Sequence, residues 1–323
     1  MYPFFSSILY CSLLSSFPLF LSDIFSSDSG FPNAIDLPGQ ADYSGTLVHS
    51  TEFKSAPAGT RAAAVIGTGT SAHDIAQRLH DQGVAEVTLV QRAPTTVISI
   101  DSHESINWKG WAGGEEMDEK TRTEMEIEGL HSKSFRRLES IHRNVVVPAI
   151  RANDEELLKG LKAKGFKTDE GEDGSGAVLK FLRRGAGYYF SVGASELICE
   201  GKIKVVGGGA HKLVKDGVEL GGGGDEDGGG GGVVPADLVV AATGFGSMSS
   251  WVTEFCGPAV AEKVGLVYGY GSGTRDDPLP YEGELRNMYK PIPGVPGLWL
   301  FGGNFTQARF YSETTALLLS MRQ

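Results

Sequence analysis

The clearest alternation of apolar and polar positions lies between residues 62 and 90. A short apolar run, Ala62 to Ile66, predicts a buried strand. The next apolar positions recur at helical spacing and would face a sheet: Ala72, Ile75, Ala76 and Leu79. Gly83 suits the end of this helix, and Val84 to Val90 predicts a second strand. A strand, a helix and a strand within about thirty residues make a βαβ unit.

Further apolar runs predict more strands and helices. Ile203 to Val206 suits a strand, and Asp216-Gly217 between apolar positions is a hairpin signal. Two buried strands, Leu238 to Gly244 and Leu298 to Asn304, run into glycines. Helical patterns cover Glu115 to Arg143, Asp154 to Lys164, Ala194 to Glu200 and Thr306 to Met321, the last with Thr306 as its expected cap. Strands that end in glycine-rich turns before helices fit a parallel α/β sheet that binds ligands at its carboxyl edge.

Composition narrows the function. The chain has 323 residues, enough for two domains with real cores. With 29 Lys plus Arg against 40 Asp plus Glu, the net charge of −11 argues against nucleic acid as a partner. The three cysteines form no Cys-x-x-Cys pair, and the seven histidines show no metal-ligand spacing. We therefore expect no metal site, and we expect His73 and His80 to be solvated on the polar face of their helix.

The first thirty residues have an unusual composition. Phe4 to Phe20 is rich in Phe, Leu and Ser, and no Lys or Arg precedes Lys54. A secretory signal normally begins with positive charge, and Pro18 and several serines interrupt a membrane span. A signal and an anchor stay open as alternatives. The preferred interpretation is a poorly ordered or aberrant leader over 1–30, with no stable membrane span and a cytoplasmic location.

The most informative motif joins the first strand to its helix. It reads Gly67-Thr68-Gly69-Thr70-Ser71-Ala72, which is Gly-x-Gly-x-x-Ala. In such a turn the first glycine allows a sharp bend, the second lets the backbone approach a pyrophosphate, and the small third residue lets helix and strand pack closely. The amides that open the helix then face the anion. We predict that Gly67, Gly69, Ser71 and Ala72 bind a dinucleotide.

The end of the second strand indicates which dinucleotide. NAD-binding proteins carry an Asp or Glu there, whereas this chain has Gln91-Arg92. A carboxylate would repel a 2′-phosphate, and a guanidinium can bind it through two parallel hydrogen bonds. Arg92 therefore favours NADPH, with a solvated strand-end charge as the alternative.

Four segments, in this order, carry a family resemblance. Tyr43 to Phe53 looks like the fingerprint Phe-x-Gly-x-x-x-His, with Tyr43 in the Phe position and His49 as the histidine. The Gly67 turn follows it, then an Ala-Thr-Gly-Phe sequence, and finally Gly302-Gly303-Asn304 through Ser312. Together they resemble the flavin-containing monooxygenase family, in its fungal and plant indole-pyruvate-type branch.

This resemblance implies a fold and a division of the chain. The expected fold is α/β, with a Rossmann-like NADPH-binding domain and the remainder of an incomplete FAD-binding Rossmann-like domain. The connector with the fingerprint would occupy 31–60 and the NADPH-binding domain 61–236. A glycine-rich insertion at 221–232 is expected to be a flexible hairpin extension, and 237–323 would return to the FAD-binding domain.

The resemblance also implies a reaction. NADPH would reduce FAD, and the reduced flavin would react with O₂ to give a hydroperoxide that oxygenates a small nitrogen-, sulfur- or carbonyl-containing substrate, as in N,N-dimethylaniline monooxygenase. The cofactors perform this chemistry, so no residue is named as an acid or base. The family pattern adds further cofactor-binding residues: Thr243, Gly244, Gly302, Gly303 and Asn304. His49 would be a positioning residue. Taken singly, His49 could be a loop histidine, Thr243-Gly244 a strand-ending turn and Asn304 a helix cap.

One departure from the family changes the expectation. Its members begin with a separate Gly-x-Gly-x-x-Gly turn for FAD, and no such turn precedes Gly67. We therefore expect an impaired FAD site and a truncated N-terminus. The alternative is a non-catalytic NADPH-binding fragment or a truncated gene model. A disulfide reductase relative would need a cysteine pair, and a hydrolase would need a Gly-x-Ser-x-Gly elbow; the sequence has neither.

Overall fold

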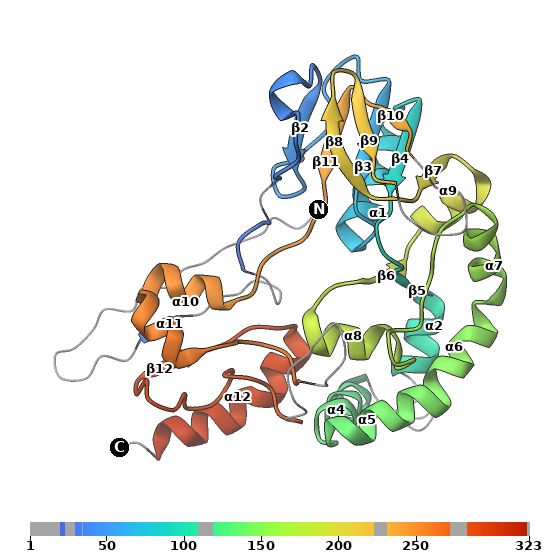
Figure 1. Cartoon of the computed structure of the whole chain (residues 1–323). Helices are drawn as coiled ribbons and strands as arrows, with labels where there is room; N and C mark the ends of the chain where they lie inside the picture. The colour runs from blue at the N-terminus through green and yellow to red at the C-terminus, as the bar shows by residue number, and fades with distance from the viewer. Residues whose placement is uncertain are drawn as a thin grey trace.

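A five-stranded parallel sheet with the order β2-β11-β3-β4-β7 lies in the upper part of the molecule in the view of Figure 1. Its strands are β2 (Thr46–His49), β3 (Ala62–Ile66), β4 (Glu86–Val90), β7 (Ile203–Val206) and β11 (Leu238–Ala241). The computed structural model describes residues 20–22, 30–33, 35–108, 119–222, 231–271 and 283–321. Parallel strands alternating with helices confirm the predicted α/β class.

Successive residues of a strand point to opposite faces of the sheet, so each face has its own apolar side chains. A different layer covers each face. On one face Val65 and Leu89 pack against α1 (Thr70–Asp81), α7 (Glu155–Ala163) and α9 (Ala194–Glu200). On the other face Ala64 and Val239 pack against an antiparallel three-stranded sheet. Its strands are β8 (Ala210–Val214), β9 (Gly217–Leu220) and β10 (Val233–Pro235). The predicted hairpin at Asp216-Gly217 joins β8 to β9.

A largely helical segment lies between β4 and β7 along the chain. It contains β5 (Thr96–Ser99), α2 (Ile100–Ser102), the π-helix η2 (His103–Trp108), α4 (Glu119–His131), α5 (Phe135–Ile141), the π-helix η3 (His142–Val146), α6 (Val147–Asn153), α8 (Gly176–Arg184) and β6 (Tyr188–Ser191). β5 and β6 pair in parallel. The helical pattern predicted from 115 to 143 breaks at 132–134, where Ser134 becomes the N-cap residue of α5.

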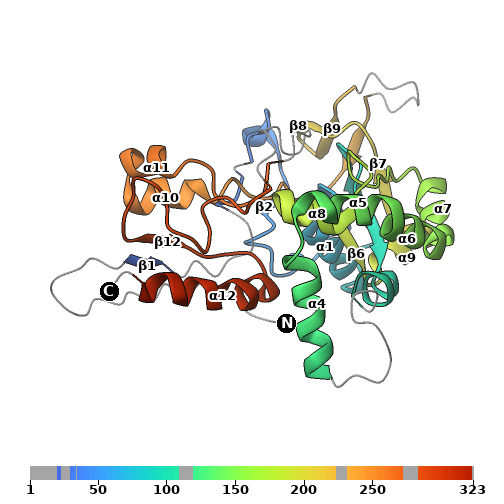
Figure 2. The ribbon, with the colours of Figure 1, turned by 90° about the horizontal axis from the view of Figure 1, so that it is seen from below.

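The C-terminal segment builds a second core. It contains α10 (Ser249–Cys256), α11 (Pro258–Val264), β12 (Leu298–Leu300) and α12 (Phe305–Ser320). β12 pairs in parallel with β1 (Phe20–Ser22), and a short 3₁₀ helix, η1 (Gln40–Asp42), precedes β2. Figure 2 shows α12 beside α4, where Arg309 donates to Glu124 at 3.3 Å.

Several expectations change in this fold. β11 pairs with β3 and β2 pairs with β11, so the sheet takes strands from both sides of the expected 61–236 unit. Thr306 is not the cap of the last helix: Asn304 is the N-cap residue, because its side chain accepts the Gln307 amide at 2.9 Å. Most of the 1–30 leader and of the 221–232 insertion lies outside the described residues. Within the part of the chain that the structure describes, no helix is both long and apolar enough to cross a bilayer.

Candidate cofactor-binding cleft

The carboxyl edge of the sheet opens into a cleft of about 2070 Å³. Strands β2, β3, β4 and β11 are parallel, so the loops that follow them meet at this edge. The cleft brings together every predicted cofactor-binding residue: Gly67, Gly69, Ser71, Ala72, Arg92, Thr243, Gly244, Gly302, Gly303 and Asn304. The sequence predictions from the two ends of the chain therefore describe one site. Its volume exceeds the roughly 300–1,000 Å³ of an ordinary small-molecule pocket.

Gly67 occupies a position that only glycine fits. Its φ is +122°, and an added β-carbon would lie 2.4 Å from the carbonyl oxygen of Ala242. Two hydrogen bonds hold this approach: Gly67 N–H donates to Val90 O at 3.0 Å, and Ala242 N–H donates to Ile66 O at 2.9 Å. The turn that follows β3 is therefore held against the ends of its two neighbours, β4 and β11.

Gly69 has the opposite surroundings. It is the N-cap residue of α1 with φ −82°, and no heavy atom of the described residues lies within 4 Å of where its β-carbon would be. No described side chain caps this helix. The amides of Thr70, Ser71 and Ala72 cannot find partners inside the helix. They give the cleft a set of donors and the positive end of a helix dipole, which together suit an anion.

Three buried polar side chains make hydrogen bonds at the turn. The hydroxyls of Thr68 and Thr95 lie 2.8 Å apart, and Nδ1 of His73 lies 3.0 Å from the Gly69 carbonyl oxygen. The expectation that His73 is solvated is wrong: it is fully buried, and burial lowers its pKa to about 4. His73 lies three residues before the buried Ala76, so both residues lie on the inner face of the helix, and this spacing could have predicted that His73 is buried.

Arg92 lies at the rim of the cleft, directly after the end of β4. The preceding residue, Gln91, is buried and makes two hydrogen bonds with the Lys167 backbone, at 2.8 and 2.7 Å. These bonds fix the end of the strand. Arg92 is exposed, and among the described residues no carboxylate forms an ion pair with it. The guanidinium is therefore free to bind an anion at the rim.

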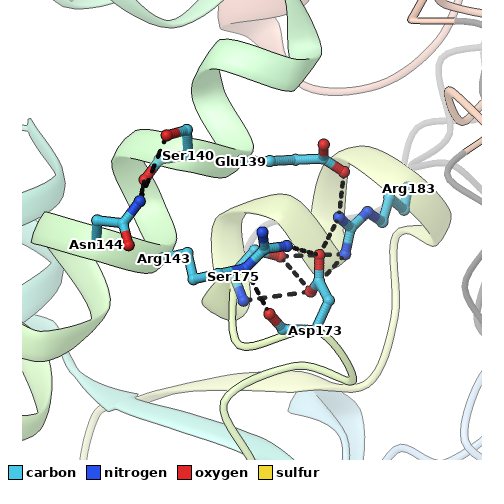
Figure 3. Close-up of polar contacts among 7 residues, drawn as sticks. All are labelled: Glu139, Ser140, Arg143, Asn144, Asp173, Ser175 and Arg183. Atoms are coloured by element: carbon cyan, nitrogen blue, oxygen red, sulfur yellow. Dashed lines mark hydrogen bonds and ion pairs between the residues drawn. The ribbon is translucent and has the colours of Figure 1, made fainter.

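Two further arginines line the cleft, and one of them is already neutralised. Arg183 donates to Asp173 at 2.6 and 2.9 Å and to Glu139 at 2.6 Å (Figure 3). Burial opposes ionisation of Asp173, but hydrogen bonds from Arg183 and Ser175 outweigh it and lower the pKa of that carboxyl. Arg143 adds a second cation to Asp173 at 2.9 Å. Arg183 therefore forms part of the cleft wall, which Arg184 also lines.

The far part of the cleft is apolar and aromatic. Its lining includes Phe181, Met248, Tyr268, Tyr289 and Phe301. The tyrosine hydroxyls are engaged with backbone, since Tyr268 donates to Phe181 O at 2.7 Å and Tyr289 to Gly302 O at 2.6 Å. These rings present apolar surface to the cleft, so this part suits an uncharged planar or aliphatic group.

The predicted Gly302-Gly303-Asn304 segment forms the entry into α12. Gly303 has φ +85°, and Asn304 forms a capping box with Gln307. The Asn304 side chain also accepts the Thr306 hydroxyl at 2.6 Å. The alternative of a helix cap is thus what the structure has for Asn304, at a place that also lines the cleft.

Thr243 and Gly244 form the turn after β11. Gly244 has φ +76°, and the Thr243 carbonyl accepts the Asn33 side-chain amide at 3.0 Å. Asn33 lines the cleft as well, although no sequence motif includes it. No pattern in the sequence could have identified it, because only the fold brings residue 33 to residue 243.

His49 lies just behind the cleft wall. It ends β2, its ring meets the Phe245 ring edge to face at 5.9 Å, and Phe245 lines the cleft. Nδ1 accepts the Thr51 amide at 3.2 Å and lies 2.9 Å from the Thr51 hydroxyl. His49 can support Phe245 but does not itself line the cleft.

The described part of the chain contains no group of three or more His, Cys, Asp or Glu residues that could hold a metal ion. Cys199 and Cys256 are both free thiols.

Comparisons with known proteins give structural likeness only. No family model and no curated protein matches the chain. A closed cyclohexanone monooxygenase structure covers 92% of this chain and 58% of its own, with 16% identity and a TM-score of 0.49. Cyclohexanone monooxygenase from Rhodococcus sp. Phi1 bound to NADP⁺ has 18% identity, coverages of 68% and 45%, and a TM-score of 0.40. An oxidised steroid monooxygenase bound to NADP has 16% identity, coverages of 71% and 47%, and a TM-score of 0.41. The chain spans about half the length of the solved structures that it matches.

Proposed function

We propose that the chain is an NADPH- and FAD-dependent monooxygenase that oxygenates a small nitrogen-, sulfur- or carbonyl-containing substrate with O₂, including substrates of the N,N-dimethylaniline type. One observation carries the proposal: a single cleft joins the Gly67–Ala72 turn to the Gly302-Gly303-Asn304 segment. A hydride can pass between two cofactors only when both lie in one site, and this cleft has room for more than one ligand.

The turn fits the NADPH pyrophosphate. Open space at Gly69 lets a phosphate approach the backbone, and the amides of Thr70, Ser71 and Ala72 have no helical partners. Arg92 stands at the end of the neighbouring strand, where the adenosine ribose of a dinucleotide lies when its pyrophosphate is bound at such a turn. Its guanidinium would bind the 2′-phosphate.

The fit for FAD is looser. Gly302 and Gly303 expose backbone to the cleft, and the aromatic lining suits a planar ring. The capping box of Asn304 already uses the Gln307 amide, so the start of α12 offers fewer free donors than the start of α1. When bound, the flavin would supply the reaction with oxygen. The protein would position it beside the nicotinamide, exclude water with its apolar lining, and support the wall through His49.

This looser fit favours one second candidate, an NADPH-binding protein without flavin chemistry. Two measurements separate the candidates. Titration of purified protein with NADPH, followed by nicotinamide fluorescence, should saturate under either reading. FAD titration followed by flavin fluorescence, and NADPH oxidation with and without FAD in aerobic buffer, should respond only if the protein is a monooxygenase. Absence of NADPH binding would overturn both.

A further inference from the structure

His73 makes an unusual pair of contacts with Gly69. Its backbone N–H donates to the Gly69 carbonyl at 3.1 Å, and its ring Nδ1 lies 3.0 Å from the same oxygen. A carbonyl oxygen only accepts, so Nδ1 carries the proton in this contact. The side chain therefore adds a second donor to the first hydrogen bond of α1.

The ring is held in a fixed orientation. It stacks on Tyr189 at 3.9 Å with an angle of 8°, and the Phe166 ring lies 5.5 Å away. The Tyr189 hydroxyl is itself fixed, because it accepts the Val192 amide at 3.2 Å. Packing against these two rings thus keeps Nδ1 aimed at Gly69.

Packing alone does not account for a histidine at this position. Nε2 is buried and has no hydrogen-bond partner among the described residues. An unpaired buried nitrogen costs about 1–3 kcal/mol, and a phenylalanine would make the same stack without that cost. What histidine supplies and phenylalanine cannot is the donor to Gly69.

That donor controls an amide that faces the cleft. The peptide between Gly69 and Thr70 is planar and trans, so its C=O and N–H point in opposite directions. A carbonyl fixed toward His73 directs the Thr70 N–H away from the core. An added β-carbon at Gly69 would meet no neighbour within 4 Å among the described residues, and both Gly69 and Thr70 line the cleft.

We propose that His73 is a positioning residue that orients the Gly69–Thr70 peptide so that the turn presents its amides to the dinucleotide pyrophosphate. This inference rests on the proposed NADPH site. The donor and the stack can be separated by substitution. His73→Asn places an amide nitrogen where the imidazole has Nδ1 and removes the stack, whereas His73→Phe keeps the stack and removes the donor.

The test measures NADPH affinity by fluorescence titration and the thermal midpoint Tm for both variants. His73→Phe should keep a Tm near that of the unmodified protein and weaken NADPH binding about fivefold to tenfold, the equivalent of one lost hydrogen bond. His73→Asn should lower Tm and leave the affinity within about twofold of the unmodified protein, since the donor persists. His80→Phe makes the same substitution further along α1, on a half-buried side chain outside the cleft, and should change neither quantity.

Amide hydrogen exchange without any cofactor gives a second readout. His73→Phe should speed exchange of the amide at position 73, whose hydrogen bond to the Gly69 carbonyl is the first of α1, while His73→Asn and His80→Phe should not. The inference is overturned if His73→Phe binds NADPH like the unmodified protein, if affinity falls with Tm in both His73 variants, or if exchange of the amide at position 73 stays slow in His73→Phe. If the unmodified protein fails to bind NADPH, the proposed function fails, and the exchange comparison still decides the role of His73.

Discussion

Gly67 lies so close to Ala242 that a β-carbon on the glycine would stand 2.4 Å from the Ala242 carbonyl oxygen. A β-carbon on Gly69 would meet no heavy atom of the described residues within 4 Å, apart from its chain neighbours. The two glycines of one turn therefore serve different ends. Gly67 is needed to fold the turn, and Gly69 leaves space for a ligand.

This contrast gives a paired prediction. Gly67→Ala should destabilise the protein by about 1–3 kcal/mol, because it adds a steric clash and a strained positive φ. Gly69→Ala should have a free energy of unfolding within about 0.5 kcal/mol of that of the unmodified protein. It should bind NADPH more weakly, because the methyl group occupies the approach to the amides. Urea unfolding and NADPH titration on both variants check this. A Gly69→Ala variant with unchanged NADPH affinity would contradict the site.

Arg92 should decide the choice between the two nicotinamide cofactors. Arg92→Ala should weaken NADPH binding by roughly tenfold to a hundredfold, the cost of charged hydrogen bonds to the 2′-phosphate. NADH lacks that phosphate, so its affinity should change much less. Parallel titrations with the two cofactors provide the measurement. An equal loss for both would rule out the 2′-phosphate contact.

The Arg183 cluster should matter for stability. Arg183→Met leaves Asp173 and Glu139 with little exposure and without their shared cation, and should cost about 3–5 kcal/mol. A matched control is Lys159→Met, which removes an exposed lysine paired with Glu155 and Glu156. Its loss should lower the unfolding free energy far less than the loss of Arg183, because water screens an exposed ion pair. Denaturant unfolding compares them, and similar losses in both would show that burial of the cluster contributes nothing.

Buried histidines should make the protein sensitive to acid. Burial lowers the pKa of His73 to about 4, below the value of 6.5 for an exposed histidine. Between these values the unfolded state binds a proton that the folded state excludes, so stability falls as pH drops from 6.5 to 4. His103, His131 and His142 have similarly lowered pKa values.

The contribution of His73 can be isolated by difference. It should make the unfolding free energy fall by up to about 1.4 kcal/mol per pH unit over this range. His73→Asn should remove that part of the slope and leave the part from the other histidines. Unfolding free energies at several pH values between 4 and 7 check this. Parallel pH profiles for the two proteins would show that the His73 pKa is not lowered by burial.

The local sequence determined the turn and its immediate neighbours. Apolar spacing predicted β3, α1 and β4, and Gly67 to Ala72 identified where a phosphate could approach, because strand period, helix period and turn chemistry are local properties. The family resemblance then implied that residues 302–304 bind a cofactor, as remnants of a flavin site.

Tertiary structure decided what local patterns cannot encode. β11 returns beside β3, which sets Ala242 against Gly67, and α12 enters the cleft from the far end of the chain. The sequence pattern predicted an exposed His73, but the ring of Tyr189, which is distant in the sequence, stacks on it and buries it. Packing between segments far apart in the chain depends on which apolar faces meet, and this is fixed only when the whole core assembles.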